Sequence, residues 1–105
     1  DPVGPIARTT LEQLRGYIAF VGADGLCREF GLSAAGMDSA HLHRRAVASA
    51  RGVILLADHS KFESASLFKI VEWDRINRLV TDQRPTDVWM NFFDQHHIEV
   101  LYPSP

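Results

Sequence analysis

Short runs of apolar residues, each too short for a helix, alternate along this chain with longer segments of helical periodicity. The runs cover residues 17–22, 53–57, 76–81 and 98–102. Continuous apolar runs of this length are typical of parallel strands that are buried on both faces of a sheet. Because parallel strands are joined by helical crossovers, the alternation predicts βαβ units and an α/β fold with a mostly parallel sheet.

Helical periodicity appears in three places, which are residues 5–15, residues 38–51 and a segment that opens at Pro85 or Thr86. Gly16 and Gly52 follow the first two segments, as glycine often does at a helix end. Between the first strand and the second helix we expect a polar loop that contains Gly31 and Gly36. A shorter extended stretch is expected over residues 67–71.

With 105 residues, the chain has the length of one compact domain, residues 1–105. Apolar residues make up 46% and charged residues 23%, which excludes a disordered tail. The net charge of −2 argues against a nucleic-acid contact by this chain, since phosphate binding needs a basic surface. No apolar run approaches the ~20 residues of a membrane span, and the single Cys27 cannot form an internal disulfide. A reducing, cytoplasmic setting without membrane contact is therefore expected.

The chain begins at Asp1 without an initiator Met and without the pattern of a signal peptide. Its ending at Pro105 has the composition of a natural tail. We interpret the chain as a fragment whose N-terminal portion has been removed. Half of any binding site is then expected to lie outside it.

An acidic residue follows each of three predicted strands. Asp24 comes shortly after the first strand, Asp58 directly after the second and Asp82 directly after the third. Ligands of open parallel sheets bind outside the carboxyl ends of the strands, so the three side chains are expected along one edge. The alternative is structural, because aspartate also caps turns and helices well.

Lys61 follows Asp58 by three residues and is positioned to neutralise a phosphate as a point charge, with the Ser60 hydroxyl beside it. The small residues around Gly22 and Gly25 allow backbone N–H groups to approach a ligand closely. Neither the dinucleotide-binding glycine pattern nor the Walker pattern is present, so no cofactor is predicted.

Other polar and aromatic residues favour structural roles. His41 and His43 are two apart on a helix and do not make a metal pair, and one cysteine gives no support for structural zinc. His96 and His97 lie at a helix end, where an imidazole can meet free carbonyl groups. Three aromatic residues of the last helix are expected in the core: Trp89, Phe92 and Phe93. Two aromatic residues outside the strong elements are assigned instead to a subunit contact: Phe30 and Trp73.

The chain resembles the C-terminal sensor domain of the DeoR/GlpR family of bacterial transcription regulators. The residues that carry the resemblance are 20–26 (FVGADGL), 31–33 (GLS), 43–47 (HRRAV), 54–62 (ILLADHSKF) and 80–82 (VTD). The resemblance implies a Rossmann-like three-layer α/β domain, of which this chain is the C-terminal part, related in fold to ribose-5-phosphate isomerase and glucosamine-6-phosphate deaminase. It also implies an N-terminal winged helix-turn-helix that binds operator DNA and that is absent from this chain.

The resemblance further implies that the sensor binds a phosphorylated sugar or related metabolite, which changes the operator affinity of the full-length protein. Asp24 would then accept hydrogen bonds from sugar hydroxyls, Gly25 would allow close approach and Lys61 would meet the phosphate. Asp58 would orient Lys61 and its loop, which contains Ser60, and Asp82 would cap a helix or shape the edge. A homo-oligomer is a family expectation.

Two alternatives stay open. The chain is either a non-catalytic sensor or a fragment of a sugar-phosphate isomerase or deaminase, whose catalytic His after Asp-Gly is replaced here by Leu26. A pocket with one acid and no positioned base does not readily move protons, which favours the sensor. A third possibility is an oligomerisation scaffold that has no ligand of its own.

Overall fold

The structure is a computed structural model, and it describes residues 16–104. The helix expected over residues 5–15 lies outside the described residues. The order of elements along the chain is β1 (Ile18–Gly22), β2 (Gly25–Cys27), β3 (Gly31–Ala34), α2 (Met37–Ser49), β4 (Gly52–Leu56), η1 (His59–Lys61), β5 (Phe68–Val71), η2 (Trp73–Arg75), β6 (Arg78–Val80), α3 (Asp87–Gln95) and β7 (Glu99–Leu101).

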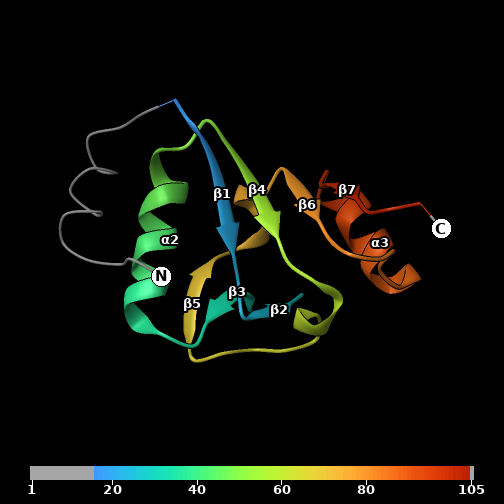
Figure 1. Ribbon diagram of the computed structural model, residues 1–105, viewed down its shortest axis with the longest axis horizontal. Helices are drawn as coiled ribbons and strands as arrows, with labels where there is room; N and C mark the ends of the chain where they lie inside the picture. The colour runs from blue at the N-terminus through green and yellow to red at the C-terminus, as the bar shows by residue number, and fades with distance from the viewer. Residues whose placement is uncertain (1–15, 105) are drawn as a thin grey trace.

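A four-stranded parallel sheet runs through the molecule in the order β1-β4-β6-β7 (Figure 1). Its strands are the four apolar runs of the sequence, and every neighbouring pair in it is parallel. The α/β prediction is therefore confirmed. Helix α2 connects β1 to β4 and helix α3 connects β6 to β7, as crossovers between parallel strands require.

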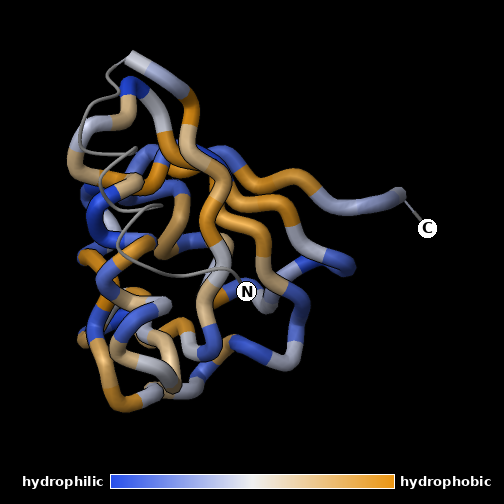
Figure 2. Tube along the Cα trace, turned by 60° about the vertical axis from the view of Figure 1, so that its left-hand side comes forward, coloured by the Kyte–Doolittle hydropathy of each residue, from blue (hydrophilic) through white to orange (hydrophobic). Residues whose placement is uncertain are grey.

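The helices pack on one face of this sheet and form the core with it. Alternate strand residues such as Val21, Leu55 and Leu79 are fully buried and belong to one cluster with Val47 of α2 and Phe93 of α3. The apolar segments therefore come together in the middle of the chain trace (Figure 2). As expected from the sequence, Trp89 and Phe93 are core residues, and Phe92 is partly buried against them.

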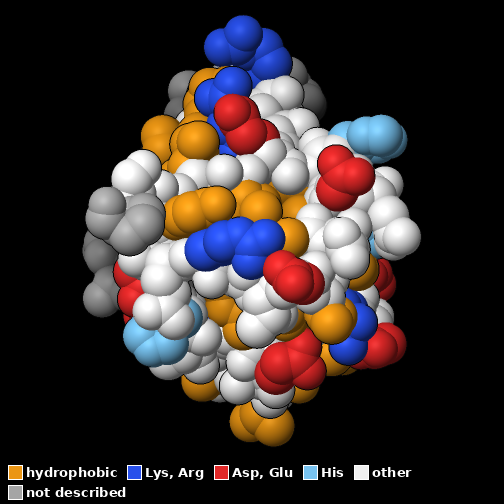
Figure 3. All heavy atoms as spheres, turned by 90° about the vertical axis from the view of Figure 1, so that its right-hand side faces the viewer, with side chains coloured by type: hydrophobic (Ala, Val, Ile, Leu, Met, Phe, Trp, Pro, Cys, Tyr) orange, Lys and Arg blue, Asp and Glu red, His pale blue; other side chains and the backbone are white. Residues whose placement is uncertain are grey.

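The other face of the parallel sheet is exposed, which differs from the expectation of strands buried on both sides. Phe20 is 63% exposed and Leu56 is 45% exposed. A cross-strand ion pair lies among these outward residues, with Arg78 Nε 2.7 Å from Glu99 Oε1. Apolar side chains also appear between charged ones on the side that Figure 3 presents. No helix of residues 16–104 covers this face, whereas parallel sheets are normally covered on both faces.

A second, antiparallel sheet in the order β2-β3-β5 replaces the polar loop that the sequence predicted after β1. The prediction was wrong because residues 31–34 are all buried and therefore show no polar alternation. Gly31 has a φ of +93°, and a Cβ there would lie 2.5 Å from the carbonyl oxygen of Val71, so the β3–β5 pairing needs glycine. The extended stretch at 67–71 is confirmed as β5.

Trp73 is also a core residue and not a free surface for a subunit contact. It is 3% exposed, and its Nε1 donates a hydrogen bond to the carbonyl oxygen of Cys27 at 2.9 Å. Its ring contacts Trp89, Phe92 and Phe93 with edge-on geometry. At the end of α3, the His96 ring lies 2.9 Å from the carbonyl oxygen of Phe92, which confirms the helix-end role. None of the helices within residues 16–104 has the length and apolar character needed to cross a membrane.

Candidate functional site

The carboxyl ends of β1, β4 and β6 meet at one edge of the parallel sheet, and the three aspartates lie there as predicted. The register pairs Gly22 of β1 with Leu56 of β4, and Leu56 with Val80 of β6. Each aspartate lies two positions after the last residue of its strand. The first turn of α2 and the short helix η1 also lie at this edge (Figure 1).

A cavity of about 310 Å³ opens between these elements, and we call it the acid-rim pocket. Its size lies in the range of small-molecule sites. Among the aspartates it contains Asp24 and Asp58 but not Asp82. Its lining residues are Gly22, Ala23, Asp24, Ala34, Ser39, His43, Leu56, Ala57, Asp58 and Lys61.

Asp24 occupies the turn between β1 and β2, where its backbone and one carboxylate oxygen hold β3 in place. Its N–H donates to the carbonyl oxygen of Ser33 at 2.8 Å, and its Oδ2 accepts from the N–H of Ala35 at 2.8 Å. Its Oδ1 accepts no hydrogen bond from the rest of the described chain. Asp24 is therefore fixed in position with one carboxylate oxygen left for a ligand.

Asp58 and Lys61 shape the opposite side of the pocket. Asp58 precedes η1, and its Oδ1 accepts a 2.8 Å hydrogen bond from the N–H of Ser60 and a short one from the Ser60 hydroxyl. The hydrogen bonds from Ser60 hold the pKa of Asp58 below its ordinary value, with a smaller contribution from Lys61. Ser60 is thus committed to Asp58 and lies outside the pocket lining. The Lys61 ammonium makes no hydrogen bond or ion pair with any other described residue.

Asp82 faces His59 instead of the pocket. Its Oδ1 accepts from the His59 N–H at 2.8 Å, and its Oδ2 lies 2.6 Å from His59 Nδ1. The hydrogen bond from the His59 side chain lowers the pKa of Asp82. Asp82 does not cap α3, because that helix begins at Asp87 after its N-cap residue Thr86. Asp82 therefore shapes the edge of the sheet by tying the end of β6 to the loop after β4.

The Asp82–His59 pair predicts an acid-dependent contribution to stability. A carboxylate whose pKa is lowered in the folded state stabilises it above the ordinary value of 3.8, and this contribution is lost as the pH falls through the lowered pKa. We expect D82N to have a lower melting temperature than wild type at pH 6, with a gap that closes toward pH 2.5. Thermal unfolding of the full-length protein between these pH values measures the gap. H59Q, which keeps the backbone donor, should lose less than D82N, and a gap independent of pH would contradict the assignment.

Gly25 has a different role from the one that the sequence suggested. It is buried, it does not line the acid-rim pocket, and a Cβ there would lie 2.7 Å from the carbonyl oxygen of Ser64 and 2.8 Å from the hydroxyl of Ser33. Glycine is needed here because the segment after Phe62 crosses directly over β2. Leu26, which follows Gly25, is fully buried and presents no functional group to the pocket.

His43 is a pocket residue that sequence reasoning missed. It lies on α2 one helical turn after Ser39, and both side chains line the acid-rim pocket. Burial lowers the pKa of His43, and the nearby charge of Asp24 opposes this effect. Spacing alone gave no signal for it, because the rotation of α2 against β1 and β3 decides which helical positions face the pocket.

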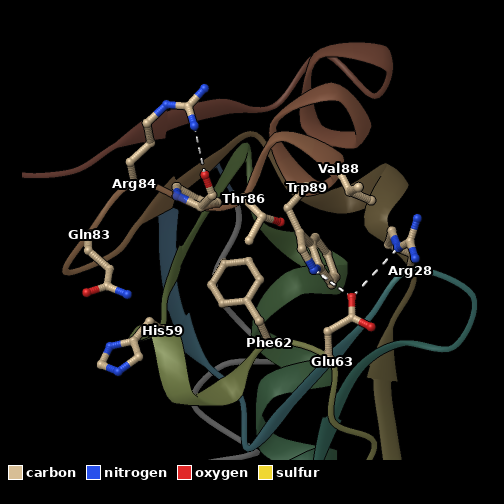
Figure 4. Close-up of a pocket in the computed structure, with 10 residues that line it drawn as sticks. Arg28, His59, Phe62, Glu63, Gln83, Arg84, Thr86, Val88 and Trp89 are labelled. Carbon is tan, nitrogen blue, oxygen red and sulfur yellow. Dashed lines mark hydrogen bonds and ion pairs between the residues drawn. The ribbon is translucent and has the colours of Figure 1, made fainter.

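A larger cavity of about 480 Å³ lies on the other side of the loop after β4, and we call it the tryptophan pocket. Figure 4 shows Glu63 between Arg28 and Trp89. Glu63 Oε2 accepts from Trp89 Nε1 at 2.7 Å and lies 3.9 Å from Arg28 Nε. Phe62 packs edge-on against Trp89 with ring centroids 4.9 Å apart. The two arginines of this pocket are both paired within the protein, Arg28 with Glu63 and Arg84 with Asp87, so the pocket is less suited to an anion than the one that holds the unpaired Lys61.

Residues 16–104 hold no group of three or more His, Cys, Asp or Glu side chains arranged to bind a metal ion. Among the polar groups that line the acid-rim pocket and have no partner in the described structure are a carboxylate oxygen of Asp24, the ammonium group of Lys61 and the hydroxyl of Ser39, and the imidazole of His43 lies beside them. They suit a ligand that combines hydroxyl groups with a negative charge.

Comparison with known proteins identifies the family of the chain. The family described as DeoR C terminal sensor domain matches residues 2–83. The HTH-type transcriptional repressor GlcR of Bacillus subtilis is 31% identical over 96 residues, which are 89% of this chain and 37% of the relative. A putative aga operon transcriptional repressor of Escherichia coli O157:H7 is 34% identical over 80 residues, 76% of this chain and 30% of the relative.

The HTH-type transcriptional regulator IolR of Bacillus subtilis is 32% identical over 82 residues, 78% of this chain and 33% of the relative. The chain thus spans about a third of the length of these curated relatives. The family match covers the acid-rim pocket completely, from Gly22 to Lys61. The chain belongs to the DeoR C-terminal sensor domain family.

Proposed function

We propose that the acid-rim pocket binds a phosphorylated sugar or a related sugar-pathway metabolite. One cavity contains both the Lys61 ammonium group and an Asp24 carboxylate oxygen, and neither makes a hydrogen bond to another described residue. This observation carries the proposal. An ammonium favours the phosphate, and a carboxylate accepts hydrogen bonds from sugar hydroxyls. Asp58, held by Ser60, positions the loop that carries Lys61.

In the full-length protein, this binding would change the affinity for operator DNA, because the ligand shifts an equilibrium between two conformations. The operator contact is assigned to a winged helix-turn-helix outside this chain. This assignment is supported by the names of two relatives described above, GlcR and IolR, which are both called HTH-type. A cytoplasmic location follows from such a role. The proposal of a homo-oligomer is supported by the exposed apolar residues of the outer sheet face, such as Phe20 and Leu56, and sedimentation of the full-length protein tests it.

The test is a thermal-shift screen of the full-length protein against phosphorylated sugars and polyols, with the free sugars as controls. A ligand that binds the folded state raises the melting midpoint, by about 2.7 kcal/mol of stabilisation at a hundred times its dissociation constant. We expect a shift with a phosphorylated compound and none with its free sugar. No shift with any compound would contradict the proposal and favour the scaffold role.

Lys61→Ala should weaken the binding of this compound by about 10- to 100-fold, since a hydrogen bond to a charged group is worth about 1.5–3 kcal/mol. Lys69→Ala is the matched control, because Lys69 lies on β5 and pairs with Glu72. Titrations of wild type and both variants with the compound measure the effect. Equal affinities in all three proteins would place the phosphate elsewhere.

A non-catalytic role is part of the proposal. The position after Gly25 holds the buried Leu26 in place of a catalytic histidine, and Glu63 lies in the tryptophan pocket, bonded to Trp89. No carboxylate other than those of Asp24 and Asp58 lines the acid-rim pocket in the described structure. Incubation with ribose 5-phosphate and with glucosamine 6-phosphate should give neither isomerised product nor released ammonia.

A further inference from the structure

The imidazole of His43 is unusual among the groups of the acid-rim pocket because one of its nitrogen atoms is buried without a hydrogen-bond partner in the described part of the protein. Its Nδ1 atom is inaccessible to solvent and has no hydrogen-bond partner there. Its Nε2 atom makes no hydrogen bond with any residue of the described chain either. Buried polar atoms normally find partners, so a proton on Nδ1 would be left without an acceptor in the described structure, and Nε2 is the ring atom left to contact a ligand.

The two ring nitrogens differ in what they can offer. A buried N–H group without an acceptor is rarer than a buried acceptor without a donor. The absence of a partner at Nδ1 favours the neutral tautomer that carries its proton on Nε2. Burial lowers the pKa of His43, which favours the neutral ring, and the charge of Asp24 opposes this effect. The group that His43 offers to a ligand is thus a neutral N–H donor.

The charged groups around the pocket are consistent with a neutral donor at this position. Asp24 borders the pocket from the turn after β1, and Asp58 and Lys61 border it from the loop after β4. On α2 itself, Arg44 is directed away and donates to the carbonyl oxygens of Lys69 and Ile70 on β5. Lys61 thus supplies the positive charge of the pocket, whereas a neutral His43 would orient a ligand through a directional hydrogen bond.

We propose that His43 is an effector-contacting residue of the acid-rim pocket and donates a hydrogen bond from Nε2 to an oxygen atom of the bound metabolite. The inference rests on the proposed function of the same pocket. It adds a contact from α2 to those from the loops after β1 and β4. The oxygen belongs either to the phosphate or to a sugar hydroxyl, and the experiments below separate these two sources.

The first experiment uses nitrogen-15 NMR of the histidine rings in the full-length protein, which reports the tautomer and charge of each ring. His41→Gln and His43→Gln assign the two signals. We expect His43 to be neutral with its proton on Nε2 at pH 7. A charged His43 at pH 7, or a proton on Nδ1, would overturn the inference.

The second experiment adds inorganic phosphate and then ribose 5-phosphate to the same sample. Phosphate alone moves the His43 signal if the acceptor is a phosphate oxygen, whereas only the sugar phosphate moves it if the acceptor is a hydroxyl. The His41 signal should not respond to either. Binding that depends on Lys61 without any change at His43 would overturn the inference and leave the proposed function intact. Absence of any Lys61-dependent binding across the sugar-phosphate panel would overturn both.

The third experiment measures the dissociation constants of several variants for one ligand. This ligand is the compound that gives the largest thermal shift in the screen of phosphorylated sugars and polyols. His43→Leu should weaken binding about fivefold to tenfold, as expected for one neutral hydrogen bond. His43→Gln keeps an N–H donor at a similar reach and should recover most of this loss. His41→Leu, on the exposed side of α2, is the matched control and should bind like wild type. A His43→Leu variant with wild-type affinity would overturn the inference, whatever its effect on stability.

Discussion

Phe93→Ala is expected to lower the free energy of unfolding by about 3–5 kcal/mol, the usual cost of truncating a buried phenylalanine. Phe93 is fully buried on α3. Its ring centroid lies 5.4 Å from that of Trp89 and 5.6 Å from that of Trp73. Because Trp73 follows β5 and Trp89 belongs to α3, this ring joins the antiparallel sheet to the helix that covers the parallel sheet. Its removal leaves a cavity that these large, mutually packed rings cannot fill.

Urea unfolding of the full-length protein, followed by the fluorescence of Trp73 and Trp89, measures this loss. Val88→Ala is the control on the same helix, since Val88 is 54% exposed and its truncation should cost less than about 1 kcal/mol. A loss below about 1 kcal/mol for Phe93→Ala would show that the aromatic cluster is loosely packed.

Gly31→Ala should have the second largest effect on stability. The residue has a φ of +93°, and an added Cβ would lie 2.5 Å from the backbone oxygen of Val71. Backbone strain at such a φ and forced overpacking each cost about 1–3 kcal/mol. The clash is with backbone, so no side-chain rotation relieves it. The pairing of β3 with β5 should therefore weaken, and the affinity for the effector should fall with it because Ala34 of β3 lines the acid-rim pocket.

Gly36→Ala is the matched control for this prediction. Gly36 precedes α2 with a φ of −106°, and nothing lies within 4 Å of the position of its Cβ. Because Gly36 is the N-cap residue of α2 and glycine is preferred to alanine there, the same chemical change should cost about 1 kcal/mol, less than the strain and the clash together cost at Gly31. Unfolding curves of the two variants make the comparison, and equal stabilities would contradict the role assigned to the Gly31 backbone.

The sequence predicted the parallel sheet well because each strand carries its own local signal. Residues 53–57, for example, form an apolar run between a glycine and an aspartate, and β4 occupies almost the same residues. The antiparallel sheet had no such signal. Its strands β3 and β5 are separated by more than thirty residues, and the buried glycine, serine and alanine residues of β3 resemble a loop in composition. Pairing between distant segments decided their structure.

For the candidate site, too, the sequence predicts one part and only the fold decides the other. The placement of Asp24, Asp58 and Asp82 at one edge follows from the sequence, because parallel strands bring their carboxyl ends together. The partners of these residues do not follow from it. Asp82 bonds to His59 and Asp24 bonds to the N–H of Ala35, and both contacts depend on how loops from different strands pack.

The order of strands and helices, the shared edge of the aspartates and the family of the chain are readable from residue order, because they depend on local periodicity and on short motifs. The uncovered face of the parallel sheet, the crossing of residue 64 over Gly25 and the entry of His43 into the pocket depend on the packing of distant elements. Packing is a property of the whole fold, since the angle and rotation of each helix are set by side chains on several other elements at once.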